Sequence, residues 1–290
     1  MYYKTKSYRL FSSFNYLALI LISVLCILPL IHILAVSLSG RSAANANLVG
    51  LWPVDFTLES YGTTLLNANF IHALWVAFER TFLGTFVSMT IIVLAAYPLS
   101  KTFSKSRNVY IWFFVFTMLF SGGLVPSYLV VQKLGLINSL WALILPGAVS
   151  VYNMILLLNF FRSISKELEE AAFIDGAGYY RTLWSVMIPI SAPALATLSL
   201  FTLVGHWNSW FDGFIYMTDY REYPLATFLQ TIIVKQDFSK LNVKPEDLAN
   251  ISQRAVNAAQ IFIGSLPILV IYPLLQRFFI KGIVLGAVKE

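Results

Sequence analysis

Residues 169–189 read EEAAFIDGAGYYRTLWSVMIP, an acidic, alanine-rich and glycine-broken stretch between two strongly apolar segments. Ser165 can cap a helix whose first turn is acidic, and each carboxylate there stabilises the positive helix end by about 0.3–1 kcal/mol. Gly176 and Gly178 can end this helix, because glycine readily adopts the left-handed conformation. The stretch therefore predicts a short helix that lies outside the lipid.

The predicted helix has a small-residue face. At 100° per residue, Leu168, Ala171, Ala172 and Asp175 fall on one side. A second amphipathic piece, YYRTLWSVMI, follows before prolines return the chain to the membrane. Two interpretations remain open, a passive surface helix at the lipid headgroups or a docking surface for another protein. Interfacial anchors are usually rich in Lys, Arg and bulky apolar residues, so this composition favours a protein partner.

The composition is that of an integral membrane protein. Of the 290 residues, 58% are apolar and only 12% are charged, about half the charged fraction of a soluble domain. The apolar run at 16–36 exceeds the roughly 7–15 residues of a signal-peptide core, so it predicts an uncleaved first span. In this setting the net charge of +6 indicates basic cytoplasmic loops and no nucleic-acid partner. The single cysteine, Cys26, has no partner thiol for a disulfide or a metal site.

Six segments reach the length of about 20 mostly apolar residues that a spanning helix needs. They are 14–38, 74–99, 109–131, 139–161, 193–217 and 259–281. The basic residues cluster on one side of this arrangement, which orients it with both termini in the cytoplasm. The clustered residues are Lys4, Lys6, Arg9, Lys101, Lys105, Arg107, Arg162, Lys166, Arg181, Arg277, Lys281 and Lys289. We therefore expect an all-α membrane protein with a cytoplasmic loop at 162–192.

The cytoplasmic loop carries a family motif. The residues Glu170-Ala171-Ala172, Asp175-Gly176-Ala177, Ile188-Pro189 and Pro193 fit EAA-x-x-DGA followed about ten residues later by [IL]-P-x-x-x-P. This loop resembles the hallmark of permease subunits of bacterial ATP-binding-cassette importers. Residues 120–149, 151–172, 206–217 and 276–290 are similar to the carbohydrate-uptake, maltose-type branch, and the ending resembles that of its second permease. Two departures are Ile188, where leucine is more usual, and Ser165, where proline is frequent.

The resemblance implies one permease domain over 1–290, with six spans in the type I importer architecture. It implies that 162–192 is a coupling loop whose helix docks into a cleft on a cytoplasmic ATPase, with Glu170 meeting a basic group. The implied docking contacts are Glu170, Ala171, Ala172, Asp175, Gly176, Ala177 and Pro189. The implied contacts of the tail with the ATPase are Gly282, Gly286 and Lys289. The Gly282-x-x-x-Gly286 spacing also occurs in helix dimers, but its place after Lys281 at the chain end argues against that reading.

The resemblance also implies the partners. These are a homologous second permease, two ATPase subunits that hold ATP and Mg, an extracytoplasmic solute-binding protein, membrane lipid and an oligosaccharide. The location would be the bacterial cytoplasmic (inner) membrane, and some relatives handle acidic uronates of the alginate type. The chain itself has no GxxxxGK[ST] stretch, so we expect no cofactor on it and no enzymatic activity of its own. Its three histidines share no metal-ligand spacing.

Polar residues within the spans are candidates for a sugar pathway. A charge at mid-bilayer costs about 2.5–3.5 kcal/mol on insertion scales, so such residues either satisfy one another between helices or serve the substrate. Aromatic faces stack on sugar rings while amides and carboxylates bind hydroxyls. In maltose-type relatives, substrate binding in the membrane falls mainly to the other permease. The candidates are Asn153, Trp207, Asn208, Trp210 and Asp212.

Two other function classes remain as alternatives. An ion-coupled secondary transporter would work without an ATPase and would use Glu79, Arg80 and Asp212 as a charge relay. A membrane-embedded enzyme would need His, Asp or Ser clustered within the spans, and the sequence lacks such a cluster. Co-purification with an ATPase subunit distinguishes the importer from the secondary transporter.

Overall fold

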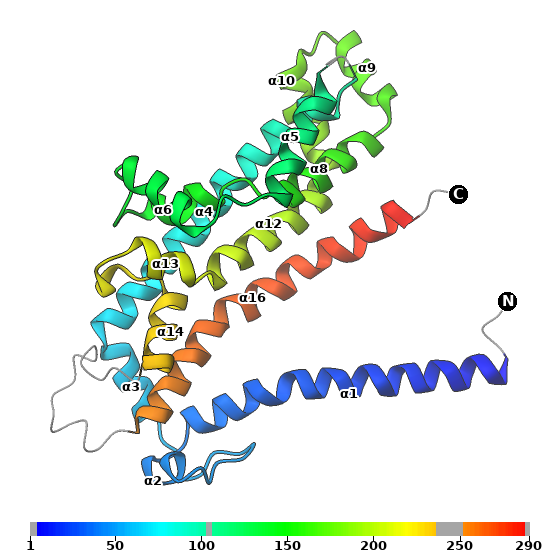
Figure 1. Ribbon diagram of the computed structural model, residues 1–290. Coiled ribbons are helices and arrows are strands. Elements are labelled where there is room, and N and C mark those ends of the chain that lie inside the picture. Colours follow the sequence, from blue (N-terminus) through cyan, green and yellow to red (C-terminus); the bar gives the residue numbers. More distant parts are fainter. Residues whose placement is uncertain (1–4, 103–105, 236–251, 288–290) are drawn as a thin grey trace. The chain divides into compact units, whose positions relative to one another are not determined.

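The computed structural model describes residues 5–102, 106–235 and 252–287, without the side chains of 233–235 and 274–287 (Figure 1). Within these ranges every regular element is a helix. The elements are α1 (Lys6–Ser37), α2 (Arg41–Asn45), α3 (Glu59–Leu66), α4 (Ala68–Ser100), α5 (Arg107–Leu119), α6 (Leu124–Lys133), α7 (Leu140–Ile144), η2 (Leu145–Gly147), α8 (Val151–Ser163), α9 (Lys166–Ile174), α10 (Tyr179–Thr182), η3 (Leu183–Met187), α11 (Ile188–Ile190), α12 (Ala192–Asn208), α13 (Phe211–Tyr216), η4 (Tyr220–Glu222), α14 (Leu225–Lys235) and α16 (Gln253–Ala287).

Three helices are long and apolar enough by themselves to cross a membrane. They are α1, α4 and the part Gln253–Pro273 of α16, and they overlap the expected segments 14–38, 74–99 and 259–281. In the described residues, three bent helix pairs raise the number of spans to as many as six when each pair is taken as one. The six-span division of a single permease domain therefore remains a prediction.

The other three expected segments are interrupted. Segment 109–131 holds α5 and α6, which meet at 113°, and segment 139–161 holds α7–η2 and α8, which meet at 52°. Segment 193–217 is wrong as one helix, because α12 ends at Asn208 and α13 begins at Phe211. The break before α6 contains Gly123 with φ of +91°, a conformation that other residues rarely adopt. Hydropathy windows register apolar length but not such backbone breaks.

Contacts divide the chain into two compact units. The first unit comprises Met1–Ile71 and Thr231–Leu266. Its core is built from small residues, because Ala35 of α1, Ala44 of α2 and Ala255 of α16 are all buried in one cluster. Small side chains permit the close approach of helix backbones in a membrane. The residues of α1 between 10 and 27 are mostly exposed and apolar, as expected for a lipid-facing helix.

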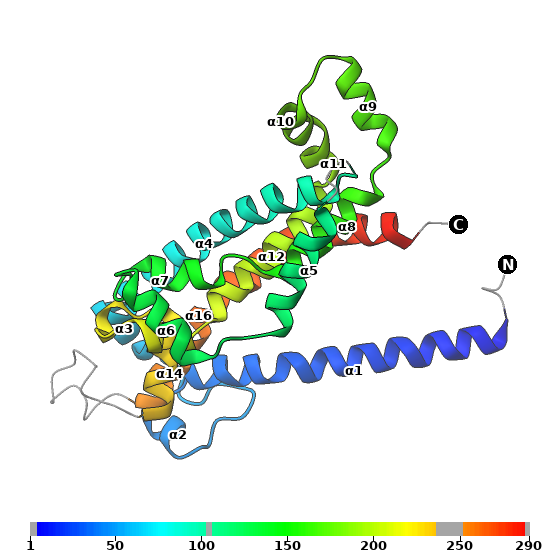
Figure 2. The ribbon, with the colours of Figure 1, turned by 45° about the horizontal axis from the view of Figure 1, so that its top comes forward.

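The second unit comprises His72–Gln230 and Pro267–Glu290 and contains both candidate sites. One of its buried clusters joins Ile92 of α4 and Leu157 of α8 to Leu198 of α12. Leu183 and Met187 of η3 belong to the same cluster, so the chain that follows α9 is anchored directly in the hydrophobic core of this unit. Along α4, the segment α9–α10 lies at the carboxyl end and α13 lies toward the amino end (Figures 1 and 2).

Candidate functional site

The EAA loop, residues 162–192, begins with helix α9. Ser165 occupies the N-cap position, but its hydroxyl donates to the Glu167 carboxylate and makes no capping bond to the backbone. The expected side-chain cap is therefore wrong. The acidic first turn is present, with Glu167 and Glu169 in favourable positions beside the positive helix end.

The carboxyl end of α9 is a Schellman motif. Gly176 has φ of +79°, its N–H donates to the Phe173 carbonyl at 3.0 Å, and the Ala177 N–H donates to the Ala172 carbonyl at 2.9 Å. The expectation for Gly176 is thus correct. Gly178 has φ of −81° and starts α10, so the expectation of a left-handed conformation is wrong there.

Replacing Gly176 with alanine will loosen the end of α9. A residue with a Cβ pays about 1–2 kcal/mol in the left-handed conformation, which corresponds to roughly fivefold or greater opening of the motif. Amide hydrogen exchange of the Ala177 peptide measures this opening. Gly178→Ala is the matched control, since its φ is ordinary and no atom lies within 4 Å of the added Cβ. Equal exchange in both variants would contradict the assignment.

The faces of α9 have different environments. Glu170, Ala171 and Asp175 are exposed, whereas Ala172 and Ala177 are half-buried. Glu169 points the other way: its carboxylate accepts from Lys101 Nζ at 2.6 Å and from the Tyr97 hydroxyl at 3.3 Å. This brace ties α9 to the end of α4, and the exposed motif residues remain available to another surface. Sequence reasoning missed the brace, although Lys101 and Glu169 were both expected on the cytoplasmic side.

Pro189 shapes the return of the loop to the membrane. Proline has no N–H and its ring collides with the carbonyl of residue i−4, so a regular helical turn before it is disfavoured. The chain widens into the π-helical turn η3, in which the Ile188 N–H donates to the Leu183 carbonyl. After Pro189 the helix direction changes by 82° between Tyr179–Ile190 and Ala192–Asn208. Pro189 itself is exposed.

The predicted tail contacts lie at the edge of the described structure. Gly282 and Gly286 belong to α16, and their surroundings are outside the described side chains. Lys289 lies outside the described residues.

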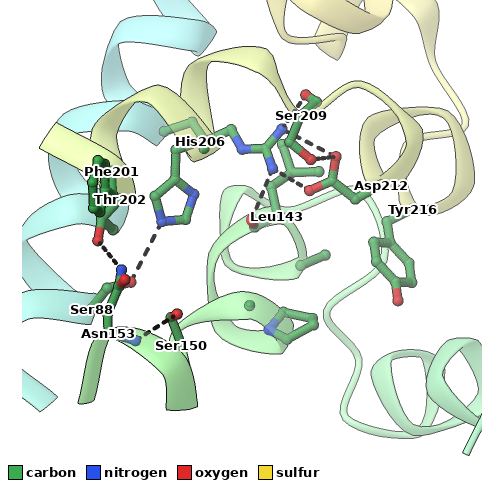
Figure 3. A pocket seen from close by; sticks show the side chains of 15 residues that line it. Ser88, Leu143, Ser150, Asn153, Phe201, Thr202, His206, Ser209, Asp212 and Tyr216 are labelled. Atoms are coloured by element: carbon green, nitrogen blue, oxygen red, sulfur yellow. Dashed lines mark hydrogen bonds and ion pairs between the residues drawn. The ribbon is translucent and has the colours of Figure 1, made fainter. Parts of the chain in front are cut away.

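A cavity of about 450 Å³, lined by both polar and apolar side chains, lies within the second unit (Figure 3). Its wall is formed by side chains from α4, α8, α12 and α13 and by the carboxyl half of the α7–η2 segment. Ser88, Asn153, Thr202 and His206 supply hydrogen-bonding groups at one side, where the Asn153 amide donates to the Thr202 hydroxyl at 3.3 Å. Within membrane helices such polar walls are costly and are retained for function.

Arg80 and Asp212 form an ion pair at the other side of the cavity (Figure 3). Arg80 is only 1% exposed, and its guanidinium also donates to the Ser209 carbonyl at 2.9 Å and the Leu143 carbonyl at 3.4 Å. Asp212 accepts in addition from the Ser209 hydroxyl and from the Gly213 N–H, both at 2.9 Å. The pair therefore fixes the break between α12 and α13 against α4 and α7.

The predicted pathway residues divide into two groups. Asn153 and Asp212 line the cavity. Trp207 is buried against Phe78 with ring centroids 5.2 Å apart, and the exposed Asn208 and Trp210 are not among the lining residues. The sequence interpretation missed Ser88, Phe201, Thr202, His206 and Tyr216, which line the cavity, and Arg80, which it assigned only to the alternative charge relay.

Gly84 lets His206 of α12 approach α4. A Cβ on Gly84 would stand 2.8 Å from His206 Nε2, so Gly84→Ala forces a shift that we expect to cost about 1–3 kcal/mol by overpacking. Gly205→Ala is the matched control, because Gly205 also lines the cavity and no atom lies within 4 Å of its added Cβ. Thermal unfolding of the purified protein should separate the two variants. Equal midpoints would contradict this packing.

Comparison with known proteins identifies the class of this membrane protein. Residues 70–284 match the family model of the binding-protein-dependent transport system inner membrane component, and the chain belongs to this family. It is thus a multi-pass component of the inner membrane and a permease component rather than the ATPase of its transporter class. The resemblance to importer permeases and the expected all-α fold are both confirmed.

Individual relatives extend over nearly the whole chain. Protein LplC of Bacillus subtilis is 37% identical over 287 residues, covering 99% of this chain and 97% of LplC. The polygalacturonan/rhamnogalacturonan transport system permease protein YtcP of the same organism is 36% identical over 284 residues, which cover 97% of this chain and 99% of YtcP. A chain in the crystal structure of a bacterial ABC transporter involved in the import of the acidic polysaccharide alginate matches with a TM-score of 0.87 and 32% identity, covering 96% of this chain and all of that one.

Proposed function

We propose that this chain is one of two permease subunits of an ATP-driven importer of acidic oligosaccharides. It forms half of the translocation pathway, performs no catalysis itself and has both termini in the cytoplasm. The observation that carries the proposal is the form of α9: Glu170, Ala171 and Asp175 are exposed while Glu169 on the same helix is held by Lys101. A helix presented in this way is suited to docking into a partner.

The attachments of α9 suit it to transmit force. Its amino-terminal half is tied to α4 through the Lys101–Glu169 pair, and the chain after α10 enters the hydrophobic core of the second unit through Leu183 and Met187. A partner that displaces α9 therefore acts on α4, α8 and α12 together. Closure of an ATPase dimer, with ATP and Mg held on those partner subunits, supplies the displacement, and the cavity changes its access from one side of the membrane to the other.

The substrate class is carried over from relatives. YtcP is named for polygalacturonan and rhamnogalacturonan transport, and the matched crystal structure concerns the acidic polysaccharide alginate. Polymers of this kind contain uronic acids, so we infer a uronate-containing oligosaccharide, delivered by an extracytoplasmic binding protein. The second permease subunit is a homologue of this chain. The cavity adds hydroxyl-binding groups, with Asn153 and Asp212 as pathway residues.

The ion-coupled alternative gains no support. A charge relay needs groups that exchange protons or ions, but Arg80 and Asp212 neutralise each other and are bound to backbone groups as well. Glu79 is exposed and accepts from Trp75 Nε1 at 2.7 Å, apart from that pair.

Uptake by cells tests the proposal. Bacteria that lack this chain should fail to accumulate radiolabelled oligogalacturonate, and the wild-type gene should restore uptake while leaving maltotriose uptake unchanged. Removal of cellular ATP should abolish the restored uptake. Uptake that continues without ATP would contradict the importer, and restored uptake of the neutral sugar alone would contradict the substrate class.

A further inference from the structure

A second pocket, of about 440 Å³, lies where the EAA loop meets the ends of three membrane helices. It is lined by the end of α4, the start of α5, the end of α8, part of α9 that includes Glu170, and Tyr179 of α10. Four bases face two acids here, a formal excess of two positive charges at pH 7. The charged lining residues are Lys101, Arg107, Arg162, Lys166, Glu169 and Glu170.

The two arginines of this pocket, Arg107 and Arg162, are hydrogen-bonded to backbone carbonyls but are not paired with an acidic side chain of the described residues. Arg107 Nη1 donates to the Lys101 carbonyl at 3.2 Å, and Arg162 Nη2 donates to the Leu99 carbonyl at 3.4 Å. Each guanidinium has five N–H donors, so most remain for another acceptor. Among the described residues neither arginine has an ion pair, since Glu169 is bonded to Lys101. Two forked cations that line one pocket are suited to a phosphate oxyanion.

The position of the pocket favours a lipid headgroup over a free phosphate ion as the source of the phosphate group. Arg107 begins α5, Arg162 lies in the last turn of α8, and Lys101 directly follows α4, so all three lie at the ends of apolar helices. Lipid phosphates occupy this level of a bilayer, and basic pockets between membrane helices on the cytoplasmic side bind anionic headgroups. Phe161, Ile164 and other apolar lining residues offer contacts to a glycerol backbone that a free phosphate ion lacks.

We propose that this pocket binds the headgroup of an anionic glycerophospholipid. The phosphate is held by Arg107 and Arg162, with Lys166 at the exposed rim. By offsetting the excess positive charge beside the Lys101–Glu169 pair, the lipid keeps α9 in its docking position. The inference does not depend on which solute the protein transports.

Native mass spectrometry of the transporter complex, purified through a tag on this chain, tests the site. With equal phosphatidylglycerol and phosphatidylcholine supplied, the wild type should retain phosphatidylglycerol selectively. The double variant Arg107→Gln/Arg162→Gln should lower that retention by roughly tenfold or more, because each basic group contributes to the affinity for an anionic headgroup. Arg181→Gln is the matched control, an exposed base in the same loop that does not line the pocket.

Two further measurements keep the test decisive. Lys166→Gln, which changes an exposed side chain, should lower retention to a smaller extent and stands in if the double variant does not fold. Millimolar inorganic phosphate should leave the bound lipid in place. Undiminished phosphatidylglycerol retention in the folded variants would overturn the proposal, and displacement by inorganic phosphate would assign the pocket to a soluble phosphate instead.

Discussion

Replacing Arg80 with glutamine will prevent accumulation of the folded protein in the membrane. The change leaves Asp212 as an uncompensated carboxylate and removes the donors to the Ser209 and Leu143 carbonyls. Breaking a buried ion pair from one side costs about 3–5 kcal/mol, which is a large part of the roughly 5–15 kcal/mol that stabilises a typical domain. The yield of monodisperse protein after detergent extraction measures the effect.

Two further variants distinguish the effect of losing the ion pair from the effect of losing any one charge. Glu79→Gln alters the neighbouring, exposed residue and should leave the yield unchanged. Arg80→Gln combined with Asp212→Asn should recover part of the yield, because no isolated charge then remains. A double variant that is no better than Arg80→Gln alone, or an Arg80→Gln protein that accumulates normally, would contradict the ion pair.

Glu170→Lys is expected to abolish ATP-driven transport while leaving the permease folded. Glu170 is exposed and no hydrogen bond within the described residues holds it, so reversing its charge should leave the fold intact, although it makes the lining of the pocket beside α9 more positive. At a docked interface the new cation would face the basic group that the motif predicts on the ATPase. Disrupting a close interfacial charge pair costs about 2–5 kcal/mol, which is about 30-fold or more in affinity.

Co-purification of the ATPase subunits and substrate-stimulated ATP hydrolysis measure this loss. Glu167→Lys is the control, because Glu167 lies on the same helix and is exposed but lies outside the motif. It should retain most of the hydrolysis. Full stimulated hydrolysis by Glu170→Lys would show that this carboxylate does not dock.

Local chemistry made part of the EAA loop predictable. The acidic first turn, the left-handed Gly176 and the helix-breaking prolines each follow from properties of single residues, and all are found in the structure. Contacts between distant residues were not predictable in this way. Lys101 and Glu169 are 68 positions apart, and nothing in their flanking residues states that α4 and α9 meet.

The directions in which side chains leave α12 explain why some predicted pathway residues line the cavity and others do not. His206 and Trp207 are adjacent, so their side chains differ by about 100° around α12. One therefore lines the cavity while the other packs on Phe78. The composition of the WNSW stretch suggested a sugar site but could not say which residues face inward. Asp212 was predicted as a pathway residue from its carboxylate beside aromatic residues, and Arg80 was placed with it only in the alternative charge relay, so their direct ion pair is a finding of the structure.

The central claim is that α9 docks on a separate ATPase, and disulfide cross-linking from position 172 tests it most directly. Ala172→Cys is introduced after Cys26, the single native cysteine, is changed to serine. Cross-links to cysteines in the helical cleft of the co-purified ATPase should form at Ala172→Cys, should change with ATP, and should be absent at the exposed Leu66→Cys in α3. If position 172 captures no ATPase in any nucleotide state while the complex still transports, α9 is not the coupling element.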